Sequence, residues 1–206
     1  VRSTEAGNIP FPSFPSLSPY NCFHHSAKKP KKPGRRSYHP LFCFEAHRHE
    51  FWHGTWRPGN AGASTGAVAF LQVCLAKVPG TLARKRIRFR MDSGFFGKRV
   101  VEFLDATGCG YVIVAKEYST IKAAAQGTHF TVLEEGWEFG EFTYQPKSWA
   151  FPHRFIVVRR PIPEDPQEAK QLTLFKDRRY AYHVLVTNLD LHPWRVYLFY
   201  NGRASI

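Results

Sequence analysis

Residues 86–115 contain a strand, a helix and a second strand in succession, and this pattern constrains the fold more than any other part of the sequence. Residues 86–91 (RIRFRM) alternate polar and apolar side chains, residues 98–106 have apolar positions at helical spacing, and residues 111–115 (YVIVA) are wholly apolar. A helix that connects two such strands makes them parallel neighbours joined by a right-handed crossover. The sequence therefore predicts an α/β fold whose sheet is at least partly parallel.

Other segments predict further strands and helices around this unit. Residues 40–48 and 50–57 are rich in aromatics and close enough to pair as a hairpin, and a helix follows Ser64 or Thr65. Beyond residue 117 the sequence changes to short strands separated by Gly or Pro turns, which indicates antiparallel pairing. We expect a helix at 121–126, strands at 130–133, 137–144, 154–160 and 180–187, and a final helix from 192.

The amino-terminal segment has neither a helical nor a strand periodicity. Four prolines fall within the first 19 residues, and proline supplies no backbone donor to a sheet. We therefore predict that residues 1–27 are a Pro/Ser-rich non-domain segment. Residues 28–37 follow as a basic arm, which is either a solvated linker or a segment that contacts phosphate.

Positive charge is concentrated in one half of the chain. Residues 1–91 hold 15 of the 29 Lys and Arg residues but only three of the 16 Asp and Glu residues, so this half carries +12 of the formal net charge of +13. Such a concentration indicates a polyanionic partner, most simply nucleic acid; the alternative is a basic surface with no partner. The predicted phosphate contacts are Lys31, Lys32, Arg35 and Arg36 in the arm, and Arg86, Arg88 and Arg90 along one face of a strand.

Two classes of protein are excluded by simple counts. No apolar run approaches the roughly 18–20 residues that a membrane span needs, so we expect no membrane partner. The four cysteines form no CxxC pair, which argues against a zinc knuckle and a disulfide scaffold and favours reduced, cytosolic thiols.

Asp92 is the strongest single candidate for a catalytic or metal-binding residue. It is the first aspartate in the chain and directly follows the predicted strand at 86–91. In open α/β sheets, ligands bind at the carboxyl ends of strands, and a carboxylate there can hold a hard divalent cation. The alternative is a capping role at the start of the next turn, which Ser93 and Gly94 would also suit.

Seven short motifs then follow one another along the chain. They are residues 38–41 (YHPL), 57–60 (RPGN), 91–96 (MDSGFF), 110–115 (GYVIVA), 144–149 (YQPKSW), 186–189 (VTNL) and 200–203 (YNGR). This series resembles the DDE transposases of bacterial insertion sequences, in the branch with a Y-R-E-K signature, over residues 32–206. The resemblance rests on all seven motifs in order and at compatible spacing, and not on any single one.

The resemblance implies a ribonuclease H-like fold, that is, a mixed sheet with flanking helices and a β-rich insertion. It also implies two-metal phosphoryl transfer on DNA, in which three carboxylates hold two Mg²⁺ (or Mn²⁺) ions about 4 Å apart. Asp92 corresponds to the second carboxylate, and is thus the expected catalytic residue and metal ligand. Tyr200 and Arg203 would contact DNA phosphate, unless they form an ordinary surface pair, and Trp149 would receive a displaced base, unless it packs in the core.

The resemblance implies two further catalytic carboxylates, and neither has a counterpart in the 206 residues of this sequence. The first would lie on an opening strand, but residues 11–18 hold no aspartate and no strand pattern, and the signature glutamate would fall immediately after Ile206. We therefore expect a catalytic domain truncated at both ends, with its first strand and last helix incomplete. On its own it would be inactive and would bind no metal productively.

Together these observations predict a fragment of a transposase that cleaves and joins DNA at insertion-sequence ends. Its expected parts are the first part of the core at 38–117, the β-rich insertion and linking strand at 118–190, and the start of the final helix at 191–206. The expected partners are the insertion-sequence ends, target DNA and a second copy in a synaptic homodimer, in the bacterial cytoplasm at the nucleoid. The alternative is a noncatalytic nucleic-acid-binding module with a degenerate ribonuclease H-like fold.

Overall fold

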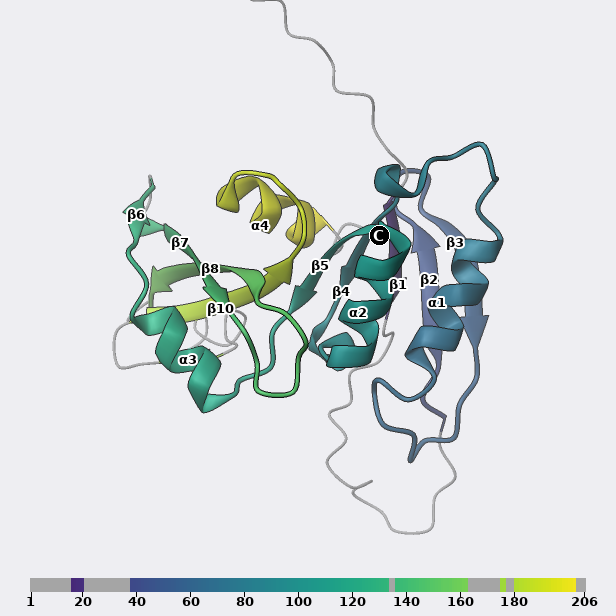
Figure 1. Ribbon diagram of the computed structural model, residues 1–206, viewed down its shortest axis with the longest axis horizontal. Helices are drawn as coiled ribbons and strands as arrows, with labels where there is room; N and C mark the ends of the chain where they lie inside the picture. Colours follow the sequence, from purple (N-terminus) through teal and green to yellow (C-terminus); the bar gives the residue numbers. More distant parts are fainter. Residues whose placement is uncertain (1–15, 21–37, 134–135, 163–174, 177–179, 203–206) are drawn as a thin grey trace, which may run out of the picture.

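The computed structural model describes residues 16–20, 38–133, 136–162, 175–176 and 180–202, with the backbone alone at 16–20 and 175–176. Helices pack against one long sheet (Figure 1). No helix in the described part of the chain combines the length and the apolar character needed to cross a membrane.

The described chain begins with three strands, alternates helices and strands from α1 to α3, and is mostly strand after α3. The strands are β1 (Ser16–Tyr20), β2 (Leu41–Glu45), β3 (Glu50–Thr55), β4 (Arg88–Met91), β5 (Gly110–Val114), β6 (Thr131–Val132), β7 (Glu138–Tyr144), β8 (His153–Pro161), β9 (Phe175–Lys176) and β10 (Tyr180–Thr187). The helices are α1 (Ala67–Ala76), α2 (Lys98–Thr107), α3 (Ser119–Gln126) and α4 (Pro193–Asn201), with short 3-10 turns at Arg84–Arg86 and Ser93–Phe95.

Within the described residues, the strands form a single mixed sheet in the order β3-β2-β1-β4-β5-β10-β8-β7-β6, with β9 paired to β10. The neighbours β1, β4 and β5 run parallel, and the other pairs run antiparallel. Helix α2 connects β4 to β5, as the strand–helix–strand pattern predicts. The predicted fold class, a mixed α/β sheet with flanking helices that is consistent with a ribonuclease H-like fold, is confirmed.

β1 lies inside the segment that the sequence predicts to be outside any domain, so the prediction of no strand there was wrong. It occupies the centre of the sheet, antiparallel to β2 and parallel to β4. Only Ser16 and Leu17 pair with β4, so Pro19 has a strand partner on the β2 side alone. A strand with one paired side tolerates the missing N–H of a proline. The neighbours on both sides make this segment a strand, although its own pattern does not indicate one.

The predicted β-rich insertion continues the sheet of the core. β8 pairs along its length with β7 on one side and with β10 on the other, and β10 pairs with β5 (Figure 1). The middle of β8 is buried on both faces, which explains why residues 155–158 (FIVV) form an unbroken apolar run. The predicted strands and the short helix in this region are present, with shifts of one or a few residues at their ends.

Helices cover the two faces of the sheet unequally. Residues of α1, α2 and α3 pack with Phe89, Met91 and Tyr111 on one face. On the other face, α4 packs over Val112 and Val114 and over the facing residues of β8 and β10. Among the described residues, no helix is packed on this second face over β2 and β3.

Candidate active site

Asp92 lies at the carboxyl end of β4, at the position that the sequence predicts. Its Oδ1 atom accepts a hydrogen bond from the Gly94 backbone N–H at 2.8 Å and so begins the 3-10 turn Ser93–Phe95. Asp92 therefore caps this turn, as the alternative interpretation of the sequence has it. A carboxylate has two oxygens with several acceptor sites, so this bond leaves Asp92, which is partly buried, with capacity for a further ligand.

The first two motifs meet in space through a buried arginine. The Nε atom of Arg57 donates to the His39 carbonyl oxygen at 2.8 Å, and its Nη1 atom donates to the carbonyl oxygens of Gly62, Ala63 and Thr65 at 3.1, 3.2 and 2.5 Å. His39 Nδ1 donates in turn to the Ala61 carbonyl oxygen at 2.9 Å. Burial lowers the pKa of Arg57. These residues hold a loop together, which is a structural role.

The motifs at 110–115 and 186–189 also meet, where β5 begins and β10 ends. Thr187 Oγ1 donates to the Tyr111 carbonyl oxygen at 2.6 Å and accepts from the Leu189 N–H at 3.0 Å. The Asn188 side chain accepts from the Tyr111 N–H and donates to the Cys109 carbonyl oxygen, both at 2.9 Å. This pair of side chains extends the β5–β10 pairing past the last ladder bond.

A third contact joins the motif of Asp92 to the motif of Trp149. The Trp149 ring lies 5.2 Å from the Phe96 ring and 4.9 Å from His153, between centroids, and only 6% of the residue is exposed. Gln145 Nε2 donates to the Trp149 carbonyl oxygen at 2.9 Å and secures the loop. Trp149 is a core residue in this structure, as the alternative interpretation of the sequence has it, and it presents no open ring face to a displaced base.

The last motif packs on β4 through α4. Tyr200 is 1% exposed and lies edge-on to His183 at 5.1 Å between ring centroids, so it does not present its ring to a phosphate in solution. Arg90, which the sequence places in a basic stripe, is buried; its Nη1 donates to the Phe199 carbonyl oxygen at 3.0 Å. In this structure Tyr200 instead packs between α4 and β10, and Arg90 bonds β4 to α4. Arg203 lies outside the described residues.

These paired motifs lie in a chain that matches a known family. A model of the family described as transposase DDE domain group 1 matches residues 29–206. The chain belongs to this family. No curated protein matches the chain. The match supports a role in DNA transposition and DNA as the substrate.

DDE transposases generally use divalent metals, so the carboxylates around Asp92 decide whether this DDE domain could hold one. Neither β1 nor α4 carries an Asp or Glu. In the part of the chain that the structure describes, no three His, Cys, Asp or Glu side chains gather closely enough to bind a metal. A cation that is held by three carboxylates therefore does not fit the described residues of this DDE domain.

Few of the predicted DNA contacts of this DDE domain are exposed residues in the described part of the chain. Arg86 is exposed in the 3-10 turn that precedes β4, and Arg88 is partly buried. The contacts predicted in the basic arm, Lys31, Lys32, Arg35 and Arg36, lie outside the described residues. Among the predicted contacts that the structure describes, Arg86 is the exposed cation.

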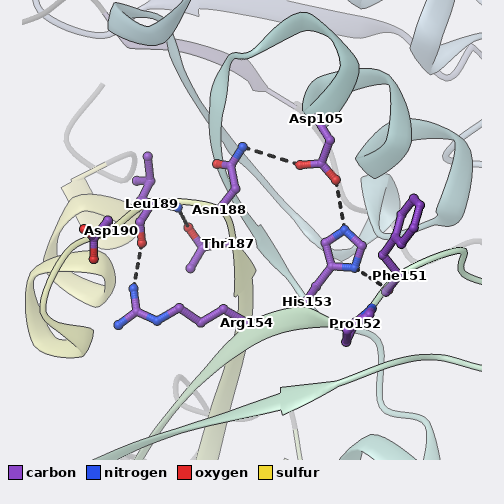
Figure 2. A pocket seen from close by; sticks show the side chains of 9 residues that line it. All are labelled: Asp105, Phe151, Pro152, His153, Arg154, Thr187, Asn188, Leu189 and Asp190. Atoms are coloured by element: carbon purple, nitrogen blue, oxygen red, sulfur yellow. Dashed lines mark hydrogen bonds and ion pairs between the residues drawn. The ribbon is translucent and has the colours of Figure 1, made fainter.

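A pocket of about 420 Å³ lies at the opposite end of the sheet from Asp92. Its residues come from the end of α2, the start of β8 and the segment after β10, next to the amino end of β5 (Figure 2). His153 Nε2 lies 2.9 Å from Asp105 Oδ2, and its Nδ1 donates to the Phe151 carbonyl oxygen, while Arg154 Nη1 donates to the Leu189 carbonyl oxygen at 2.6 Å. The sequence analysis gave these residues no role. Their polar atoms bond to one another and to Cys109, Tyr111 and Glu141 on neighbouring elements, which indicates a structural role in holding these elements together.

Proposed function

We propose that this chain acts in DNA transposition as part of an insertion-sequence transposase of the Y-R-E-K branch, and that the polypeptide of residues 1–206 binds DNA without cleaving it. The observation that carries this proposal is the position of Asp92, at the carboxyl end of β4 and beside β1, with no acid on either β1 or α4.

Charge supports DNA as the ligand. The described residues 38–91 hold eight Lys and Arg residues against Glu45 and Glu50, and Glu45 is buried while it accepts from the His47 and Arg48 N–H groups. The exposed cations of this region include Arg48 and Arg86. Phosphate contacts by such cations release counterions, which makes binding strongly dependent on salt.

Carboxylate chemistry supports the absence of cleavage by this polypeptide. A single carboxylate neither fixes two cations nor orients a nucleophile between them, so the stabilisation of charge at phosphorus is lost. In the intact family enzyme Mg²⁺ or Mn²⁺ would supply that stabilisation. Binding, in contrast, needs only the basic surface and the fold, and both are present here.

DNA binding is tested by fluorescence anisotropy with a duplex that carries the terminal repeats flanking the gene. We expect affinity to fall as salt rises, and the salt slope to decrease by about one unit in Arg86→Ala. Lys98→Ala is the matched control, since it removes another exposed cation, from α2. An equal effect of both substitutions would contradict a specific role of Arg86, and the absence of DNA binding would overturn the proposal.

Cleavage is tested on a supercoiled plasmid that carries the same ends, with Mg²⁺ or Mn²⁺. We expect no nicking, and therefore no difference between the original chain and Asp92→Asn. Metal-dependent nicking that disappears in Asp92→Asn would overturn the proposed inactivity, because it would mean that other groups complete the site. A synaptic homodimer at the nucleoid remains part of the proposal and predicts a dimer on sedimentation with two DNA ends.

The second candidate function is a noncatalytic nucleic-acid-binding module, and the same lack of acids on β1 and α4 favours it. Competition separates the two candidates. A transposase fragment should prefer the terminal repeats over a duplex of shuffled sequence, whereas a general binding module should bind both equally.

A further inference from the structure

Five aromatic side chains, three of them exposed and two partly buried, form a cluster on and next to the hairpin β2–β3. We call them the aromatic platform: Tyr38, Phe42, Phe44, Phe51 and Trp56. Tyr38 is 73%, Trp56 is 69% and Phe51 is 61% exposed. Exposed aromatic surface of this kind is costly in water and marks a binding surface more often than a neutral one. The sequence analysis noted that these strands are rich in aromatics but gave them no function.

The rings of the platform meet edge to face. Trp56 lies 5.7 Å from Tyr38 and 5.9 Å from Phe42, at interplanar angles of 76° and 88°, and Phe51 makes similar contacts with Phe42 and Phe44. In each of these pairs the edge of one ring meets the face of the other, and the exposed fractions of Tyr38, Trp56 and Phe51 show that ring surface remains accessible. Gly54 makes this arrangement possible: a Cβ atom there would lie 2.8 Å from the Phe42 ring and 2.9 Å from the Phe51 ring.

The platform and Asp92 belong to the same face of the sheet. Phe42 alternates with Leu41 and Cys43, which are buried with Met91 beneath α1 and α2. Asp92 follows Met91 in extended backbone and therefore falls on the face opposite that core, as Phe42 does. The described helix on this face, α4, covers the β5, β8 and β10 region and leaves the platform open.

The register also brings the platform and Asp92 to the same level. Leu17 on β1 pairs with Phe89 on β4, and Tyr20 pairs with Phe42 on β2. Three residues beyond Phe89, Asp92 is level with Tyr20 and hence with Phe42. With β1 between them, β2 and β4 lie about 10 Å apart where both pair with β1. A DNA strand that reaches Asp92 can therefore place neighbouring nucleotides over the platform.

We propose that the aromatic platform binds the bases of single-stranded DNA next to Asp92, an inference that rests on the proposed function and names the form of its ligand. Aromatic rings together with cations suit a nucleic acid, because bases stack on the rings while cations neutralise the phosphates. The turn that joins β2 and β3 carries the exposed Arg48, and residues 38–91 hold more cations than acids. Bases within a duplex already stack on each other, so only unpaired bases can use the rings.

The test uses the whole 206-residue chain with an oligothymidylate of about 20 nucleotides, which is longer than a binding site of about 4–16 nucleotides, and with a duplex of the same length. We expect Trp56→Ala and Phe51→Ala each to weaken single-strand binding by at least about fivefold and to leave duplex binding unchanged. Trp56→Phe should retain most of the affinity. Phe151→Ala is the matched control, because Phe151 is 70% exposed and lies in the pocket at the opposite end of the sheet.

Three results would overturn the inference, and they are separable from a failure of the proposed function. The first is full single-strand affinity in Trp56→Ala, and the second is an equal loss in Phe151→Ala. The third is a dimer that becomes a monomer in Trp56→Ala with DNA affinity retained, since the platform would then be covered by a second copy. Duplex binding that depends on salt would leave the proposed function standing in each case. The absence of binding to either DNA would overturn both.

Discussion

Arg57 donates a hydrogen bond from Nε to the carbonyl oxygen of His39 at 2.8 Å, and this contact joins the first two sequence motifs of the chain. The His39 N–H donates to the Arg57 carbonyl oxygen at 2.9 Å, so the two residues bond in both directions. The first two motifs that carry the resemblance thus bond to each other, and their role in this region is structural.

We predict that Arg57→Lys destabilises the fold by at least about 2 kcal/mol. A lysine ammonium lacks the planar fork that reaches several carbonyl oxygens at once, and the abandoned oxygens stay buried. The free energy of unfolding from urea titration measures the effect. Arg48→Lys, on an exposed turn residue, is the control and should change stability by less than about 0.5 kcal/mol. Equal stability of the two variants would contradict the proposed role of Arg57.

We predict that Thr187→Val costs about 1–3 kcal/mol, although valine has nearly the same shape as threonine. The substitution leaves the Tyr111 carbonyl oxygen and the Leu189 N–H without their partner in a buried place. Amide hydrogen exchange should quicken at Leu189 first. Thr143→Val on β7 serves as the control because Thr143 is exposed. Unchanged exchange at Leu189 would refute the prediction.

We predict that Trp149→Ala loses stability and that Trp56→Ala loses affinity for single-stranded DNA. The buried Trp149 ring fills space against Phe96, and its removal should cost about 3–5 kcal/mol. Trp56 is exposed, so its removal should change stability by less than about 0.5 kcal/mol. Thermal denaturation and anisotropy measured on both variants give the comparison. A stable Trp149→Ala variant that has lost DNA affinity would restore the base-receiving role for Trp149.

We predict that stability falls as the solution becomes alkaline. A hydrogen bond with the Cys74 thiol, together with burial, raises the pKa of Cys43, and burial beside Asp105 raises the pKa of Tyr111. In the unfolded chain these groups lose their protons near about pH 8.5 and pH 10, while in the folded chain they stay neutral. Stability is therefore complete below about pH 8 and declines above it.

Urea midpoints at about pH 7, 9 and 10 check this prediction, and Cys43→Ala should flatten the decline between about pH 8 and 9. A midpoint that rises over this range would contradict it.

The sequence by itself determined the fold class, because residues 86–115 hold strand, helix and strand with side-chain periods that permit little else. It also located Asp92 at the carboxyl end of β4, since that position follows from where the strand stops. Local periodicity is a property of neighbouring residues, so a single sequence displays it. The match to the DDE family agrees with the motif series for the same reason: motifs and their order are visible along the chain.

Only the tertiary structure decided where β1 lies and which candidate residues are accessible. Ser16–Tyr20 becomes a strand because β2 and β4 supply partners from distant parts of the chain. Trp149 and Tyr200 are buried, while Trp56 is exposed, although all three are large aromatic residues. Burial depends on which face a helix covers, and α4 covers the β5–β8 region but leaves β2–β3 open. No local sequence pattern specifies which face a helix covers, because that depends on packing between segments far apart in the chain.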